Sequence, residues 1–368
     1  MTTDIRFLFV HKGGAHDPGL QAMLRWFPRI IPHYDELLIE DAVRGKKSTD
    51  TTTPLSTVLD AIRVYKPTHI LTWVPLFNEA ELQFCHERGI FVLAVANSFV
   101  SLSSGIFKDQ LRFLTLLAQY DAYFIPHAPH VRVLRRHGVS AFEMPFFYDP
   151  EVYFPRSPNV WWRWLEREYP VLFIGSVMEP GAENRIELLT ALASHFPVYV
   201  VTYQRPSIPG VHWLGVANSE KLINRLLNRS AVVLGSDFVT DRQLDEFNGR
   251  IENLIEPYTD RYTLRVRVAT TMGSGACYAV EGHEEMSRFA GAEDAWIPWS
   301  DISEAVERIG MVLRDKNKRA QMANIGWQGV NKRHTVGVRI HEMVATITGG
   351  GSGVAAKHVL LTQKEDSK

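Results

Sequence analysis

The sequence contains very little cysteine and no long hydrophobic run. Of its 368 residues only two are cysteines, Cys85 and Cys277, which lie far apart in the chain. This excludes a disulfide framework, and no CxxC pair is present that could bind a metal. No stretch approaches the ~20 apolar residues that span a bilayer, and the apolar run near Met1 is too short for a signal peptide. We therefore expect a cytoplasmic protein with no integral membrane segment.

An excess of charge of either sign is also absent. Forty Lys and Arg against 41 Asp and Glu leave a formal net charge of -1. No global positive field would draw the chain to nucleic acid or anionic lipid, which argues against a long nucleic acid as substrate. The hydrophobic fraction of 45% and the charged fraction of 22% are typical of a globular protein. The length predicts about two domains.

Several catalytic and cofactor motifs are missing. The sequence has no Walker loop, no GxSxG elbow and no HExxH helix, and the absence of GxGxxG counts against a dinucleotide-dependent dehydrogenase. His127 and His130 in "PHAPH" have no third ligand at a recognisable spacing. We expect two exposed turn histidines there, no bound metal and no cofactor.

What the sequence does contain is an alternation of short apolar runs and amphipathic segments. Near-continuous apolarity predicts strands buried on both faces of a parallel sheet. The predicted strands are Ile5–Val10, Thr68–Trp73, Ile90–Val95, Ala122–Ile125, Val171–Ile174, Val198–Thr202, Val211–Leu214, Ala231–Leu234 and Ala276–Val280. Between them, Leu55–Pro67 and Asn184–Pro197 have helical spacing, the latter with an Asn cap. The fold class is therefore α/β, with open parallel sheets.

The runs form two sets, separated by the proline- and aromatic-rich connector Met144–Pro158. We predict a first domain over residues 1–150 and a second over 151–334. Residues 335–348 form a last helix that returns to the first domain. Residues 349–368, which begin with a glycine-rich run, form a flexible tail.

Five segments resemble one family when they are taken in order. They are "PFFYDPEVYFP", "VLFIGSVMEPGAENRIELLTAL", "GVHWLGVANSEKLINRLLNRSAVVLGSD", "RVRVATTMGSGACYAVEGHEEMSRFAG" and "RHTVGVRI". Together, from Ala122 to Ile347, they resemble the GT-B glycosyltransferases, with the nearest likeness to CgeB-like and group 1 glycosyl transferases. The resemblance implies two Rossmann-like domains facing across a cleft. It also implies metal-independent transfer of a sugar from a nucleotide-diphosphate donor, with a UDP-sugar expected as co-substrate, to an acceptor hydroxyl.

Candidate donor-binding residues follow the predicted strands of the second domain. Gly175 and Ser176 allow close approach of a phosphate at a helix N-terminus, and Arg185 can clamp it with two hydrogen bonds. Tyr203 can stack on a base, Arg205 can face phosphate, and the backbone at Gly215 can contact the base edge; an ordinary surface loop is an equal alternative.

The stretch from Arg265 to Glu285 carries further candidates. They are Arg265, Arg267 and Gly275, followed by Glu281, Gly282, His283, Glu284 and Glu285. Glu285 or Glu281 can accept the two ribose hydroxyls, and Gly282 can present its N–H to phosphate or sugar. Many relatives carry Glu-x7-Glu, but Val268 or Thr270 occupies the position of the first Glu. This departure leaves the sugar open, and a solvated loop remains the alternative.

The first domain is expected to supply the acceptor side. Lys12, Gly13 and Gly14 follow the first strand, where glycine N–H groups can form an anion-binding nest; a simple turn is the alternative. The loop resembles the Lys-x-Gly-Gly loop of glycogen-synthase-like enzymes, and this resemblance implies that Lys12, Gly13 and Gly14 bind the donor, facing its distal phosphate across the cleft. His16 or Asp17 can act as general base if the enzyme inverts, whereas a retaining enzyme needs none there. Asn97 and Ser98 follow another strand and complete the acceptor side.

Two other functions remain open from sequence. One is a nucleotide-sugar epimerase of the same fold, and the other is a degenerate, non-catalytic nucleotide-binding module. The acceptor itself, whether glycan, lipid, protein, small molecule or modified DNA, is not indicated by any motif.

Overall fold

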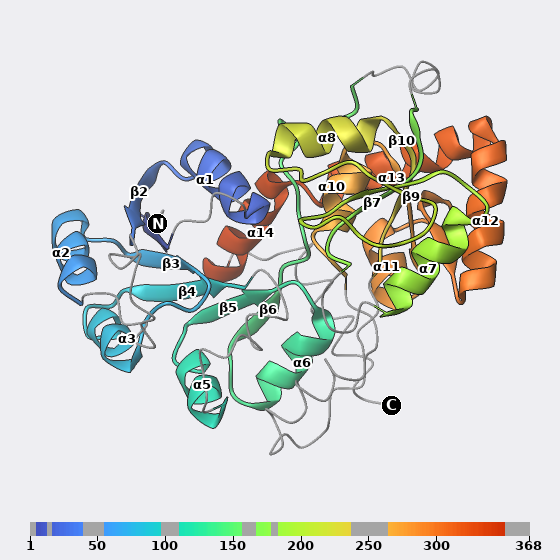
Figure 1. The fold of residues 1–368 in the computed structure, drawn as a ribbon. Helices are drawn as coiled ribbons and strands as arrows, with labels where there is room; N and C mark the ends of the chain where they lie inside the picture. Colours follow the sequence, from blue (N-terminus) through green and yellow to red (C-terminus); the bar gives the residue numbers. More distant parts are fainter. Residues whose placement is uncertain are drawn as a thin grey trace. The chain divides into compact units, whose positions relative to one another are not determined.

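The structure, a computed structural model, describes residues 5–12, 17–39, 55–96, 110–156, 167–177, 183–236 and 264–349. The chain divides into two compact units, Met1–Met144 with Val336–Lys368, and Pro145–Thr335. Figure 1 shows a sheet with surrounding helices in each. Among the described helices, none combines the length and the hydropathy that crossing a membrane requires.

The first unit contains a six-stranded parallel sheet in the order β2-β1-β3-β4-β5-β6. Its strands are β1 (Arg6–His11), β2 (His33–Leu38), β3 (His69–Trp73), β4 (Phe91–Val95), β5 (Ala122–Ile125) and β6 (Ala141–Glu143). Its helices are α1 (Pro18–Ile30), α2 (Leu55–Tyr65), α3 (Glu79–His86), α5 (Gln110–Leu117), α6 (Ala128–Arg136) and α14 (Val336–Ile347). The last of these packs on α1, where a Cβ added to Gly337 would lie 3.4 Å from the Trp26 ring.

The second unit contains another six-stranded parallel sheet, in the order β12-β11-β10-β7-β8-β9. Its strands are β7 (Tyr169–Ile174), β8 (Val198–Val201), β9 (Val211–Trp213), β10 (Ser230–Leu234), β11 (Cys277–Glu281) and β12 (Ile297–Trp299). Its helices are α7 (Glu183–Ala193), α8 (Glu220–Asn228), α10 (Arg267–Gly273), α11 (Glu284–Ala290), α12 (Ile302–Arg314) and α13 (Lys316–Arg333), with a short 3-10 helix at Glu293–Ala295.

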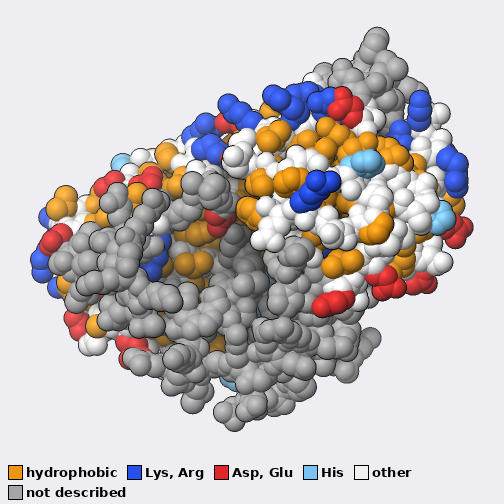
Figure 2. Space-filling view, in the orientation of Figure 1, with side chains coloured by type: hydrophobic (Ala, Val, Ile, Leu, Met, Phe, Trp, Pro, Cys, Tyr) orange, Lys and Arg blue, Asp and Glu red, His pale blue; other side chains and the backbone are white. Residues whose placement is uncertain are grey.

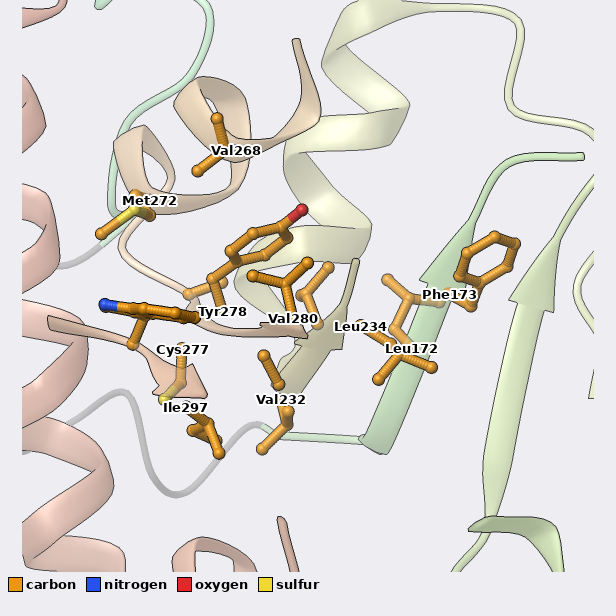
Figure 3. Close-up of a cluster of buried hydrophobic side chains, with 14 of the residues drawn as sticks. Leu172, Phe173, Val232, Leu234, Val268, Met272, Cys277, Tyr278, Val280 and Ile297 are labelled. Carbon is orange, nitrogen blue, oxygen red and sulfur yellow. The ribbon is translucent and has the colours of Figure 1, made fainter. Parts of the chain in front are cut away.

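The core of the second unit lies on both faces of its central strands. Leu172, Val232 and Val280 belong to it, together with Val268 and Met272 of α10 (Figure 3). Burial on both faces is why these strands are apolar throughout and do not alternate with polar residues. The predicted α/β class and the parallel sheets are therefore confirmed.

Each predicted apolar run forms a strand, but three strands lack that signal. β2, with the sequence HYDELL, is a largely exposed edge strand. β6 and β12 also lie at sheet edges and have three residues each. The expected Asn cap is wrong, since α7 begins at Glu183, one residue before Asn184.

The expectation of two exposed histidines is also wrong. His127 and His130 are each 1% exposed, and their rings lie 5.1 Å apart in an edge-to-face arrangement. Burial, with His127 and Arg132 nearby, holds the pKa of His130 well below its ordinary value, so this ring is neutral.

The strand order of the second unit reverses between β7 and β10. Chain connections leave this point in opposite directions, so neighbouring loops separate and leave a crevice at the carboxyl ends of the strands. The residues that follow β7, β8, β10 and β11 lie along this edge. A ligand of the second unit is therefore expected there.

Candidate functional site

Gly175 and Arg267 are in direct contact at the end of β7. A Cβ added to Gly175 would lie 2.7 Å from Nη2 and 3.2 Å from Cζ of Arg267. Gly175 has a φ of +152°, a value that L-residues rarely adopt, and its N–H donates to the carbonyl of Val201 on β8. Two features favour glycine at this position. One is the φ value, and the other is the Arg267 guanidinium, which occupies the space that a side chain would need.

A second guanidinium reaches the same turn. Arg185 lies in the first turn of α7, and its Nη1 donates to the carbonyl oxygen of Ser176 at 2.5 Å. Arg185 and Arg267 belong to different helices, yet their guanidinium groups reach the same turn. That of Arg185 contacts Ser176, and that of Arg267 lies beside Gly175. The predicted pair of arginines is therefore brought together beside β7, at the reversal point of the sheet.

Two other predicted residues on the α10 segment lie differently. Arg265 is partly buried, two residues before α10, and its carbonyl accepts the N–H of Val268. Gly275 follows the other end of α10, where it turns with a φ of +67°, and its carbonyl accepts from Arg167. It precedes β11, so it lies at the amino-terminal edge of the sheet. The assignment of Gly275 to the donor site stays a prediction.

The ends of β8 and β9 carry an exposed aromatic and apolar surface. Tyr203 is 80% exposed and Trp213 40% exposed, and hydrophobic side chains of the second unit reach the surface in Figure 2. Arg205 is exposed as well, while Gly215, with a φ of +91°, accepts the N–H of Thr202. A flat ring could be held here next to backbone polar groups.

The acidic stretch after β11 divides into side chains with different tasks. His283 caps α11, since its Nδ1 accepts the N–H of Met286 at 3.2 Å. Glu284 is exposed, whereas Glu281 and Glu285 are partly buried. Glu285 Oε2 accepts the N–H of Leu264 at 3.4 Å.

The backbone N–H of Gly282, which the sequence offered as a donor to the ligand, has a partner within the sheet. Its N–H donates to the carbonyl of Trp299 on β12 at 2.8 Å, as part of the sheet edge. The same hydrogen bond cannot also be given to a phosphate. An added Cβ would lie 3.5 Å from that carbonyl oxygen, an ordinary van der Waals distance, so space alone does not require glycine here.

The position where relatives carry the first Glu offers no carboxylate. Val268 is fully buried in the core, and Thr270 is 6% exposed with its hydroxyl donating to the carbonyl of Arg267. Both residues therefore support α10.

The closing "RHT" motif fixes α11 from behind. Arg333 Nη2 donates to the carbonyls of Phe289 and Ala290 at 3.1 and 2.5 Å, and the His334 ring stacks on Phe289 at 3.8 Å. A cation at the last carbonyls of a helix interacts favourably with the negative end of the helix dipole. The motif holds the helix that carries Glu284 and Glu285.

In the first unit, Asp17 has a structural task. Its Oδ1 accepts the N–H groups of Gly19 and Leu20, and its Oδ2 accepts the indole N–H of Trp73 at 2.9 Å. Both carboxylate oxygens are engaged in capping α1 and fixing Trp73. The role of Asp17 as a general base stays a prediction.

The remaining predictions for the first unit are only partly covered. Lys12 follows β1 and is partly exposed. Gly13, Gly14 and His16 lie outside the described residues, as do Asn97 and Ser98. Among the described residues, no group of three or more His, Cys, Asp or Glu side chains is placed to hold a metal ion.

Comparison with known proteins gives one partial family match and several similar folds. Residues 185–345 match the model of a family described as glycosyl transferase-like. The fold is similar to that of sucrose-phosphate synthase from Thermosynechococcus elongatus, at 11% identity and a TM-score of 0.63, covering 94% of this chain and 100% of that one. HepE from Anabaena, in complex with UDP and glucose, is 12% identical with a TM-score of 0.59 and the same coverage.

An epimerase is also similar. UDP-GlcNAc 2-epimerase from Neisseria meningitidis, bound to UDP-GlcNAc, is 13% identical with a TM-score of 0.53, covering 94% of this chain and 100% of that one. No curated protein sequence matches the chain. The chain has the GT-B fold, as the sequence predicted, and its residues 185–345 resemble the glycosyl transferase-like family. Its place in the CgeB-like subgroup stays a prediction.

Proposed function

We propose that the second unit binds the diphosphate of a UDP-sugar beside Gly175 and that the chain transfers this sugar to an acceptor hydroxyl. The observation that carries the proposal is the contact between Gly175 and Arg267 at the reversal point of the sheet. Arg185 adds a second positive group at the same turn. Guanidinium groups are well suited to a diphosphate because each can give two parallel hydrogen bonds.

The same arrangement serves catalysis as well as binding. Negative charge grows on the leaving diphosphate as the bond to the sugar breaks, and groups held in place beforehand stabilise that charge. Arg267 and Arg185 would meet this charge, so the proposed reaction needs no metal ion. We expect sugar transfer to continue in the presence of a chelator.

The base and the ribose have candidate partners along the same edge. Tyr203 and the backbone at Gly215 would contact the base, and Glu285 would accept the ribose hydroxyls. UDP as the nucleotide is supported by HepE and by the epimerase, whose structures contain UDP or UDP-GlcNAc.

The test is a ligand-stabilisation experiment with UDP, GDP, ADP and UDP-sugars. A ligand that binds only the folded state at 100 times its Kd stabilises it by about 2.7 kcal/mol. Arg267→Ala and Glu285→Ala should abolish the stabilisation by UDP, whereas Arg308→Ala, on an exposed part of α12, should keep it. Equal stabilisation of wild type and Arg267→Ala would remove this donor site.

Turnover separates the alternatives. A glycosyltransferase releases UDP when an acceptor is added, whereas an epimerase converts the UDP-sugar without one. A non-catalytic module would bind UDP and do neither.

A further inference from the structure

The ring of Phe173 lies beneath both arginines of the proposed donor site. Its centroid is 5.5 Å from Cζ of Arg267 and 5.8 Å from Cζ of Arg185. Phe173 is 1% exposed and lies on β7, two residues before Gly175. Figure 3 shows its ring on the opposite side of the strand from the side chain of Leu172, and both residues belong to the hydrophobic core.

A ring and a carboxylate would affect these arginines differently. The face of an aromatic ring carries partial negative charge and attracts a cation within about 6 Å. A carboxylate would accept the N–H donors and neutralise the charge, whereas a ring attracts the face of the guanidinium and uses none of its N–H groups. The ring therefore orients the guanidinium, and the positive charge of the guanidinium is not neutralised.

One ring lies near both guanidinium groups, whose side chains end at the same turn. Arg185 Nη1 reaches the Ser176 carbonyl, and Arg267 Nη2 lies where a Cβ of Gly175 would be. Both side chains thus end on the turn that directly follows the Phe173 ring. Attraction to one shared ring offsets part of the cost of holding two like charges at one turn.

We propose that Phe173 is a positioning residue, which holds Arg185 and Arg267 for the diphosphate of the donor. This inference rests on the proposed function and extends it to a residue that makes no contact with the ligand itself. It implies that Phe173 sets the affinity for the charged diphosphate and leaves the affinity for the nucleoside unchanged.

The experiment compares UDP with uridine in binding titrations of the full chain. Phe173→Leu and Phe173→Met remove the ring and keep an apolar side chain, while Phe173→Tyr retains the ring. Leu172→Val, on the other side of the same strand, controls for lost packing. Circular dichroism and urea unfolding of each variant verify that it is folded.

We expect Phe173→Leu and Phe173→Met to weaken the binding of UDP about 5- to 30-fold. The affinity for uridine should change less than about twofold. The Phe173→Tyr variant, which retains the ring, and the Leu172→Val variant should both bind UDP as the wild type does. Unchanged UDP affinity without the ring, or equal losses for UDP and uridine, would overturn the role of Phe173 alone. Failure of the wild type to bind any nucleoside diphosphate would overturn both proposals.

Discussion

The contact between Gly175 and Arg267 leads to a prediction in which one methyl group weakens binding as well as folding stability. In Gly175→Ala the new Cβ would lie 2.7 Å from Nη2 of Arg267, closer than such atoms approach. The obstacle is the end of a long flexible side chain and not backbone. We expect the guanidinium to swing away while the fold persists.

The two costs can be estimated separately. Placing alanine at a φ of +152° strains the backbone, which costs of the order of 1–3 kcal/mol. Displacing Arg267 removes charge-assisted hydrogen bonds to the diphosphate, worth about 1.5–3 kcal/mol, which corresponds to a 10- to 150-fold loss of affinity for UDP.

The assay is a double-mutant cycle of UDP binding. Gly175→Ala and Arg267→Ala should each weaken binding, and the double variant should be little worse than Arg267→Ala alone, because both act through one guanidinium. Gly138→Ala is the matched control, since it has a φ of +77° but an added Cβ would meet nothing within 4 Å. Additive losses in the double variant would refute the reasoning.

Three further predictions concern stability, each measured by urea unfolding. Glu81 is 2% exposed and burial raises its pKa, so the wild type loses stability as pH rises from the ordinary pKa of Glu through the raised value. Glu81→Gln should remove this loss above the ordinary pKa of Glu, and an unchanged pH dependence would contradict the argument. Asp17→Ala should lower the free energy of unfolding by about 1–2 kcal/mol, and Asp17→Asn by less; a loss as large in Asn would speak against the cap. Gly273→Ala, usually favourable in a helix, should cost about 1–3 kcal/mol because the Tyr148 ring lies 2.5 Å from the added Cβ; a more stable variant would contradict this.

The sequence predicted the sheets well because burial on both faces leaves a direct mark on composition. Runs such as Val171–Ile174 and Ala231–Leu234 are strands in the structure. The edge strand His33–Leu38 left no such mark, since an exposed edge accepts polar residues. The glycine and arginines beside β7 were also within reach, because strand ends of a parallel sheet are predictable positions for polar chemistry.

Other site residues depended on contacts that no local pattern contains. The hydrogen bond that Asp17 accepts from the indole of Trp73, which lies far along the chain, is one such contact. Gly275 shares its segment with Arg267, but the length of α10 places the two at opposite ends of the helix.

By itself the sequence determined the α/β class and the buried strands of both sheets, because burial on both faces leaves a mark on consecutive residues. Only the tertiary structure decided that Arg267 lies against Gly175 and that Phe173 lies beneath both arginines. A phenylalanine in an apolar strand has the same local pattern whether it packs on a leucine or on a guanidinium. What it touches is set by helices that come from elsewhere in the chain.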